Sequence, residues 1–174
     1  MRLGAMVTTR KQNKHQATGK LLILQNQRRP DRFNQMLRSC WLVFFNANGI
    51  VHKEFVPPGQ TVNHQFYLEV LKRLHDSVRK KRPEMWCSGD WFLHHDNAPA
   101  HMALSVQQFL AKNMTVIPHP PYSPDLVPCD FFLFPRIKCQ MKGKHFADVS
   151  KVKKKTLDFL NNINTEEFQK CFQQ

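Results

Sequence analysis

The sequence lacks several features that would define a membrane, secreted or zinc protein. No stretch approaches about 18 consecutive apolar residues, and no apolar segment of signal-peptide length follows the basic N-terminus. The five cysteines are odd in number and include no Cys-x-x-Cys pair, which argues against a disulfide framework and a zinc ribbon. We therefore expect a soluble intracellular protein with reduced thiols and no membrane partner.

Acidic residues are also scarce. Thirteen Asp and Glu residues stand against 26 Lys and Arg residues in 174, which gives a formal net charge of +13. Such an excess favours a polyanionic partner, most often nucleic acid, over a small-molecule substrate. A generic basic surface is the alternative that composition alone leaves open.

The basic charge is concentrated near the N-terminus. Residues 1–38 hold nine Lys and Arg residues and one acid, Asp31. Apart from the apolar run Leu21–Leu24, the segment has little periodicity, so we expect a basic, disordered arm in front of one domain at 39–174. Nonspecific DNA binding by this arm and the absence of any selected function remain equal alternatives.

The rest of the chain alternates between strand and helix patterns. The apolar run 40–45, followed by Asn-Ala-Asn-Gly, predicts a buried strand and a tight turn. The other predicted elements are strands at 50–56, 91–95 and 115–117, and helices at 62–78, from Pro99 to 112, and from 130, 149 and 165. This order predicts an α/β protein whose mixed sheet is flanked by helices.

Two aspartates stand where such elements begin or end. Asp96 closes a predicted strand in His94-His95-Asp96-Asn97-Ala98-Pro99-Ala100-His101, and Asp130 opens a helix after Tyr122-Ser123-Pro124-Asp125-Leu126-Val127-Pro128-Cys129. Carboxylates fixed at such positions suit Mg²⁺ or Mn²⁺. Capping of the following helix is the alternative for each aspartate.

These two segments, with Gly49–Phe55 and Met141–Phe146, resemble the catalytic domain of mariner-type (Tc1/mariner) transposases over about residues 36–174. The resemblance implies a ribonuclease H-like fold, in which three carboxylates hold two divalent metal ions that cut and join DNA. It implies that Asp96 and Asp130 are the second and third carboxylates. The family's N-terminal helix-turn-helix region is not recognisable in 1–38, and we expect the domain to be truncated at its C-terminus.

The resemblance places the first carboxylate at Asn46, directly after the strand at 40–45. An amide oxygen carries no charge, and the neighbouring NH₂ group is a donor, so this residue is a poor bridge between two metal ions. We expect Asn46, Asp96 and Asp130 to share one shallow cleft with weakened metal binding, and Asn46→Asp to strengthen that binding. The 33 residues between Asp96 and Asp130 are one fewer than in the family.

Other side chains provide weaker predictions. Four histidines near Asp96 suggest zinc, but no His-Glu-x-x-His helix is present, and we instead expect His94 or His95 to orient Asp96. Six basic side chains have two open interpretations, contact with DNA or a place on a solvated helix face. They are Lys72, Arg73, Arg79, Lys80, Lys142 and Lys144.

The resemblance implies a transposon-derived DNA-binding protein of the nucleus, with the cytoplasm as a second possible compartment, Mg²⁺ or Mn²⁺ as cofactor and a homodimer as a possible assembly. Its ancestral reaction is two-metal DNA cleavage and strand transfer, impaired here by Asn46. The alternative is a noncatalytic protein that keeps only the fold and binds DNA or another partner. A translated remnant without a stable fold is the third reading.

Overall fold

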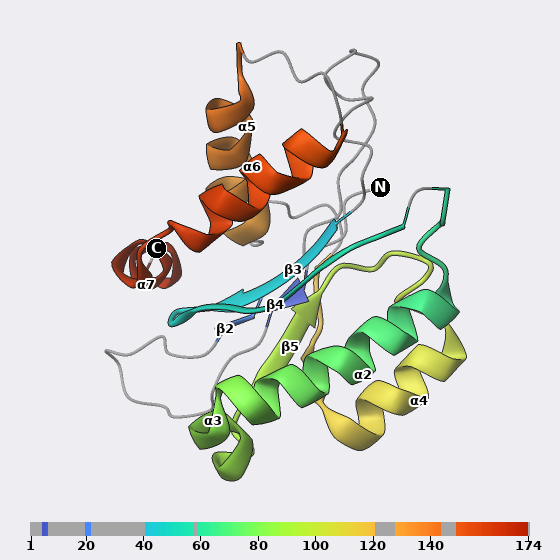
Figure 1. The fold of residues 1–174 in the computed structure, drawn as a ribbon. Helices are drawn as coiled ribbons and strands as arrows, with labels where there is room; N and C mark the ends of the chain where they lie inside the picture. Colours follow the sequence, from blue (N-terminus) through green and yellow to red (C-terminus); the bar gives the residue numbers. More distant parts are fainter. Residues whose placement is uncertain are drawn as a thin grey trace.

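A computed structural model of the chain describes residues 5–6, 20–21, 41–57, 59–120, 128–143 and 149–173. These residues form three layers, in which a central group of strands lies between α2 and α4 on one side and α5, α6 and α7 on the other (Figure 1). The elements are β1 (Ala5–Met6), β2 (Lys20–Leu21), β3 (Trp41–Asn46), β4 (Gly49–Phe55), α2 (His64–Lys81), α3 (Pro83–Ser88), β5 (Phe92–His95), α4 (Leu104–Asn113), β6 (Thr115–Ile117), the π-helical turn η2 (Cys129–Leu133), α5 (Phe134–Met141), α6 (Val149–Asn161) and α7 (Thr165–Phe172).

The predicted hairpin is confirmed. Strands β3 and β4 pair antiparallel, from Trp41 opposite Phe55 to Asn46 opposite Gly49. In the turn, the Asn48 backbone N–H donates to Asn46 Oδ1 at 3.0 Å. Gly49 has a φ of +104°, a conformation that a residue with a side chain rarely adopts. The turn therefore follows from the local sequence Asn-Ala-Asn-Gly.

The remaining strands form a mixed sheet around β5. Strands β6 and β2 pair with β5 in parallel, and β1 pairs with it antiparallel. Strand β3 packs beside β1 and β2 rather than pairing with β5. The expected mixed α/β class is confirmed, with strands from the N-terminal segment standing between β3 and β5.

Strands β1 and β2 come from the segment that we expected to be a disordered arm. These four residues pair with the edge of β5 that β6 leaves open. Backbone groups along a strand edge need partners when they are buried, which gives a physical reason for this pairing. The other residues of 1–38 lie outside the described residues, and the domain boundary at 38/39 stays a prediction.

Both faces of β3 are buried, and all six of its residues belong to the interior. Leu42 and Phe44 point into a core shared with α2 and α4, whereas Val43 and Phe45 point into a second core shared with η2, α5, α6 and α7. Successive side chains of a strand point to opposite faces, so one continuous apolar run can serve two cores.

Helix α2 covers the first of these cores, as its apolar periodicity predicts. Asn63 caps its start by accepting a hydrogen bond from the Phe66 N–H at 2.9 Å. The helix ends at Lys81, and Pro83 begins α3 rather than simply terminating α2. Its buried residues are Phe66, Tyr67, Val70, Leu71, Leu74 and Val78.

The helix after Asp96 begins later than predicted. Its first residue is Leu104 and its N-cap is Ala103, so Pro99 does not lie in its first turn. Instead, the backbone N–H groups of His101 and Met102 both donate to the Ala98 carbonyl, at 2.8 and 3.1 Å. This turn places His101 in the interior before the helix starts.

The predicted helix starts near Asp130, Val149 and Thr165 are confirmed. Among the described residues, no helix is both long and apolar enough to cross a membrane. Cys87, Cys129, Cys139 and Cys171 form no disulfide with one another.

We predict that Phe45→Ala lowers the free energy of unfolding by about 3–5 kcal/mol, because it leaves a cavity among aromatic rings. The Phe45 ring centroid lies 6.3, 5.3 and 5.9 Å from those of Phe132, Phe168 and Phe172. Urea unfolding followed by fluorescence measures the loss. Leu104→Ala, at a position 74% exposed, is the control and should change stability by under about 0.5 kcal/mol. Equal losses for the two variants would contradict the two-core arrangement.

Candidate functional site

Asp96 directly follows β5, and 14% of its side chain is exposed. Its Oδ1 accepts a hydrogen bond from the Ala98 N–H at 3.2 Å and lies 3.0 Å from His101 Nδ1. The carboxylate thus closes a short turn by accepting a hydrogen bond from Ala98, two residues further along the chain. Because Ala103 is the N-cap of α4, the helix-capping alternative for Asp96 is wrong.

Behind Asp96 lies a stack of aromatic rings. His101 is fully buried, and its ring centroid is 3.8 Å from that of Tyr67, in α2, and 4.9 Å from that of His95. The Tyr67 hydroxyl is 3.2 Å from His95 Nδ1. Side chains from β5, from the turn that follows it and from the first turns of α2 therefore meet behind one carboxylate.

Burial sets the charge of this group. It lowers the pKa of His101 to about 3, against the smaller opposing effect of the hydrogen bond to the Asp96 backbone. It also lowers the pKa of His95 to about 3, with smaller contributions from His101, His94 and His119. Burial, and secondarily the Asp96 charge, raises the pKa of the Tyr67 hydroxyl well above its usual value. At neutral pH all three side chains are uncharged.

A second pair of histidines joins β5 to the chain after β6. His94 Nε2 and His119 Nδ1 are 2.9 Å apart, and the Asn97 side chain donates to the His119 carbonyl at 2.9 Å. The proline-rich segment 118–128, which follows β6 in the sequence, therefore begins beside Asn97, the residue after Asp96. Residues 121–127 of this segment lie outside the described residues.

The structure places Asn46 away from Asp96. Asn46 is fully buried in the β3–β4 turn, and its Nδ2 donates to Met85 Sδ, in α3, at 3.2 Å. In the same turn, the Asn48 carbonyl accepts from the Arg82 guanidinium at 2.9 Å. The turn is thus hydrogen-bonded to the junction between α2 and α3.

The length of α2 separates the two sites. Tyr67, near the start of α2, contacts His95 and His101, while Arg82, directly after its end, contacts the β3–β4 turn. At 1.5 Å per residue, these two points of the helix are about 22 Å apart. Figure 1 shows the same arrangement, because the β3–β4 turn lies on the side of α3 and β5 points away from α3. The expectation that Asn46 and Asp96 share one cleft is therefore not met.

Asp130 is the second residue of η2, where the sequence predicts a helix start. Its side chain lies outside the described residues, so its distance from Asp96 stays a prediction. The neighbouring Phe132 packs against Phe45 and Phe168, which fixes η2 on the second core. A π-helical turn of this kind is often found at functional sites.

The donor chemistry distinguishes the candidate metal ligands. The Asp96 carboxylate is partly exposed and offers the charged oxygens that Mg²⁺ and Mn²⁺ prefer. Asn46 does not fit, since its Oδ1 accepts from the Asn48 N–H and its NH₂ group faces the Met85 sulfur. Within the described parts of the chain, no three His, Cys, Asp or Glu side chains are grouped to hold a metal ion.

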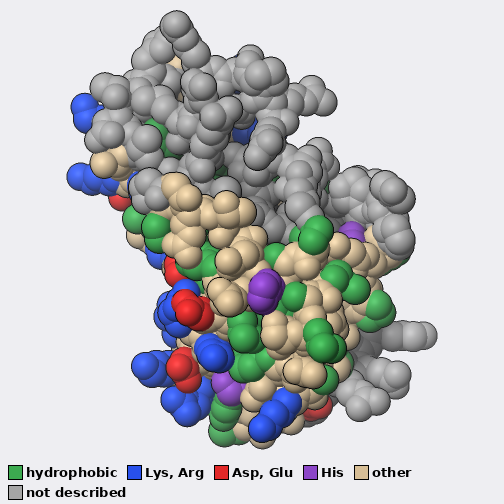
Figure 2. Space-filling view, turned by 90° about the vertical axis from the view of Figure 1, so that its right-hand side faces the viewer, with side chains coloured by type: hydrophobic (Ala, Val, Ile, Leu, Met, Phe, Trp, Pro, Cys, Tyr) green, Lys and Arg blue, Asp and Glu red, His purple; other side chains and the backbone are tan. Residues whose placement is uncertain are grey.

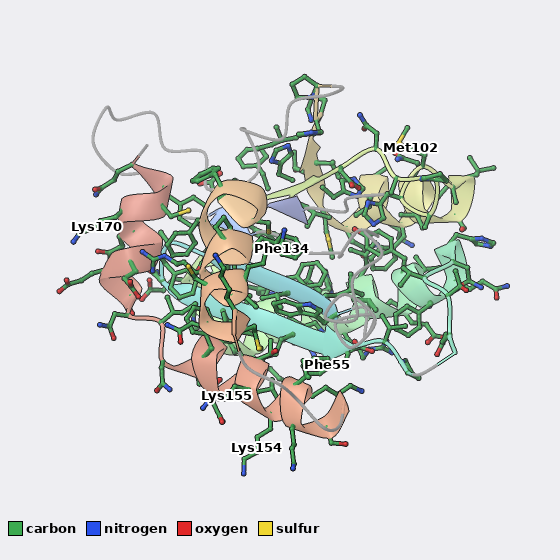
Figure 3. All side chains as sticks on the ribbon, turned by 90° about the horizontal axis from the view of Figure 1, so that it is seen from above. Phe55, Met102, Phe134, Lys154, Lys155 and Lys170 are labelled. Carbon is green, nitrogen blue, oxygen red and sulfur yellow. The ribbon has the colours of Figure 1, made fainter. Side chains whose placement is uncertain are left out.

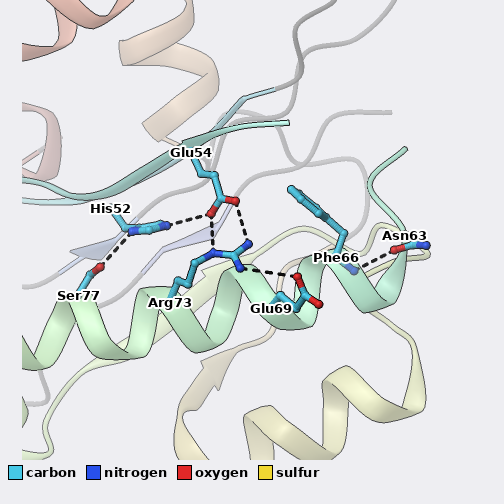
Figure 4. Close-up of polar contacts among 7 residues, drawn as sticks. All are labelled: His52, Glu54, Asn63, Phe66, Glu69, Arg73 and Ser77. Atoms are coloured by element: carbon cyan, nitrogen blue, oxygen red, sulfur yellow. Dashed lines mark hydrogen bonds and ion pairs between the residues drawn. The ribbon is translucent and has the colours of Figure 1, made fainter. Parts of the chain in front are cut away.

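Two of the predicted DNA-contacting residues form ion pairs within the protein. Arg73 donates to both carboxylate oxygens of Glu54, at 3.0 and 2.8 Å, and lies 3.7 Å from Glu69 (Figure 4). Arg79 pairs with Asp76 at 3.3 Å. Figure 2 shows acidic side chains among the basic ones along one edge of the face it presents. The exposed residues Lys72, Lys80 and Lys142 remain candidates, and Lys144 lies outside the described residues.

Helix α6 carries a further basic row, for which the sequence leaves DNA contact and a solvated helix face equally open. Lys151, Lys154 and Lys155 are exposed, and positions three and four apart share one face of a helix. Figure 3 shows Lys154 reaching outward from α6. Lys153 differs, because its Nζ lies 5.3 Å from the centroid of the Phe55 ring, at the protein surface.

Sequence reasoning missed His101 and Tyr67. It assigned the orientation of Asp96 to His94 or His95, whereas His101 hydrogen-bonds to the Asp96 carbonyl and its Nδ1 lies 3.0 Å from the carboxylate. The only available signal was the presence of His101 five residues after Asp96 in the same short motif. Nothing in the periodicity of α2 indicated that Tyr67 would contact that histidine.

Comparison with known proteins points to one family. A family model described as "Transposase (partial DDE domain)" matches residues 10–88 and so reaches into the predicted N-terminal arm. Mariner Mos1 transposase from Drosophila mauritiana is 35% identical over 128 residues, which cover 72% of this chain and 36% of that protein. The human histone-lysine N-methyltransferase SETMAR is 27% identical over 125 residues, 71% of this chain and 18% of that protein. The matched part of the chain thus spans about a third of the length of Mos1 transposase and less than a fifth of the length of SETMAR.

Solved structures agree in fold. The crystal structure of the Mos1 catalytic domain superposes with a TM-score of 0.72 at 27% identity, covering 89% of this chain and 68% of that one. Structures of that domain have been solved with Mg and with Mn, and a Mos1 paired-end complex with the left transposon end is also similar.

We predict that acid destabilises the protein through His95 and His101. Above about pH 6.5 both histidines are neutral in the folded and unfolded chains, so they contribute no pH dependence. Between about pH 6.5 and 3 the unfolded chain binds protons that the folded chain does not, so the free energy of unfolding falls as pH falls. Each histidine contributes up to about 1.4 kcal/mol per pH unit.

Urea unfolding at pH 7.5, 6.5 and 5.5 measures this slope. The double variant His95→Gln/His101→Asn should have a flatter slope than the wild type over this range. Leu104→Ala, at an exposed position in α4, is the control and should leave the slope unchanged. A wild-type slope no steeper than that of the double variant would show that the two imidazoles are not held neutral.

Proposed function

This chain is a partial homologue of the mariner-type transposase catalytic domain, and on that premise we propose that it is a DNA-binding protein whose Asp96 holds a divalent metal ion. We assign it the ribonuclease H-like architecture of that domain. As part of the same proposal, Mg²⁺ or Mn²⁺ is the ion, transposon-like DNA is the partner and the nucleus is the compartment.

The observation that carries the proposal is the position and support of Asp96. Its carboxylate lies at the end of β5, and one oxygen accepts from the Ala98 N–H and lies 3.0 Å from His101 Nδ1. Asp130, at the start of η2, is the proposed second ligand. When bound, such a metal ion lowers the pKa of a water molecule and stabilises the charge on a leaving phosphate oxygen.

We propose that DNA cleavage is weak and that strand transfer is lost. Asn46 does not supply the third ligand, because it lies at the other end of α2 and its side chain is occupied within the hairpin turn. Asp31 is the one acid of residues 1–38, and it lies outside the described residues. With fewer carboxylates, the site has less attraction for a second dication.

DNA binding rests on the net charge of +13. Lys151, Lys154 and Lys155 on α6 support it best, since they are exposed and form no ion pair with another described residue. Lys72, Lys80 and Lys142 are further candidates. A homodimer is also part of the proposal, and size-exclusion chromatography with light scattering tests it.

We predict that the wild-type chain binds Mn²⁺ and that Asp96→Asn weakens this binding at least tenfold. Two unit charges about 4 Å apart attract each other by about 4 kcal/mol at an effective dielectric constant of 20, and tenfold corresponds to about 1.4 kcal/mol. Titration of free Mn²⁺ by electron paramagnetic resonance measures the affinity. Nicking of supercoiled DNA in Mn²⁺ is read in parallel.

Asn46→Asp serves as the matched control. Its new carboxylate would be buried near the α2–α3 junction, so the variant should be less stable and should bind Mn²⁺ no more tightly than the wild type. Stronger Mn²⁺ binding by Asn46→Asp would restore the three-residue site. If the wild type binds DNA but no Mn²⁺, the noncatalytic alternative is correct.

We predict that DNA affinity falls by orders of magnitude between about 50 and 200 mM salt, with little preference for sequence. The triple variant Lys151→Gln/Lys154→Gln/Lys155→Gln should lower the slope of log K against log salt by about 1 for each phosphate that is no longer neutralised. Arg79→Gln is the control, since Arg79 is already paired with Asp76. Fluorescence anisotropy with a labelled duplex measures both. An unchanged slope in the triple variant would exclude α6 from the DNA interface.

A further inference from the structure

His101 faces Asp96 with a single nitrogen. Its Nδ1 lies 3.0 Å from Asp96 Oδ1 and 3.1 Å from the Asp96 carbonyl oxygen. A carboxylate and a carbonyl oxygen can only accept hydrogen bonds, so the proton of the neutral imidazole must reside on Nδ1. His101 therefore donates to the Asp96 carbonyl, and the same N–H group lies within reach of the carboxylate oxygen Oδ1.

The second ring nitrogen of His101, Nε2, is buried and has no hydrogen-bond partner among the described residues. Leaving a buried polar atom without a partner costs about 1–3 kcal/mol, and an apolar side chain of similar size would avoid that cost. Stability alone therefore does not explain why a histidine occupies this position.

The ring is held in a fixed orientation from two sides. Tyr67 stacks on it with an interplanar angle of 28°, and His95 stacks on it with an angle of 27°. The Gln107 side chain also donates to the His101 carbonyl at 3.2 Å. These contacts join the donor nitrogen to α2, β5 and α4, which are rigid elements of the first core.

We propose that His101 is a positioning residue for Asp96, whose Nδ1–H holds the carboxylate in the rotation that receives the metal ion. The Ala98 N–H donates to the same Oδ1 at 3.2 Å, so two N–H groups lie beside one oxygen of the ligand. Outer hydrogen bonds of this kind orient metal ligands, and their loss typically costs 10–100-fold in metal affinity. The inference rests on the proposed metal-binding function of Asp96.

Three variants test the role of His101. His101→Leu removes the donor, and Mn²⁺ affinity should fall by about 10–100-fold. His101→Asn places an amide nitrogen the same number of bonds from the backbone as Nδ1, and it should restore most of the affinity. His52→Leu is the matched control, because His52 is a largely buried histidine of β4 that hydrogen-bonds to Ser77 and Glu54; its affinity should stay within about twofold of the wild type.

A second measurement does not depend on metal. Long-range ¹H–¹⁵N correlation spectra of the metal-free wild type should show His101 as the Nδ1–H tautomer. Thermal unfolding of each variant establishes that it is folded at the titration temperature.

The outcomes separate the inference from the proposed function. If Asp96→Asn weakens Mn²⁺ binding but His101→Leu does not, the positioning role is overturned and the proposed function stands. An Nε2–H tautomer, or equal losses in His101→Leu and His101→Asn, likewise overturns it. If Asp96→Asn leaves Mn²⁺ binding unchanged, the proposed function fails and the positioning role fails with it.

Discussion

The burial of β3 on both faces is the constraint on which the rest of the structure depends. Leu42 and Phe44 pack in the core under α2, and Val43 and Phe45 in the core under the helices that follow η2, so each core is incomplete without this strand. Phe44 and Phe45 are adjacent in sequence and yet belong to different cores. Because a strand side chain can only point to one face or the other, a change of register by one residue would reverse every one of these contacts.

That constraint also decides where the ends of β3 lie. The strand carries its turn to the α2–α3 junction, where Asn48 meets Arg82 and Asn46 meets Met85. Strand β5 runs the other way relative to α2 and brings Asp96 to the first turns of that helix, where Tyr67 lies beside His95 and His101. The candidate metal site and the hairpin turn are thus at opposite ends of one helix, and neutral rings rather than further carboxylates stand directly behind Asp96.

Much of the fold was predictable because its causes are local. The apolar run before Asn-Ala-Asn-Gly and the strand pattern after it predicted the hairpin, and a stripe of apolar residues at helical spacing predicted α2. Asp96 was correctly placed at a strand end and Asp130 at a helix start. The short strands β1 and β2 were missed, because two-residue elements in a basic segment are stabilised by pairing with β5 and not by any pattern of their own.

By itself, the sequence determined the α/β class, the hairpin, the main helices and the family resemblance, all of which depend on residues close together in the chain. Tertiary structure alone decided which strand ends meet. It separated Asn46 from Asp96, brought the His101 ring to within 3.0 Å of the Asp96 carboxylate, and paired Arg73 with Glu54. The physical reason is that helical and strand periodicity fix which face a residue occupies, whereas the neighbours across that face come from distant segments whose order and direction are set by packing of the whole core.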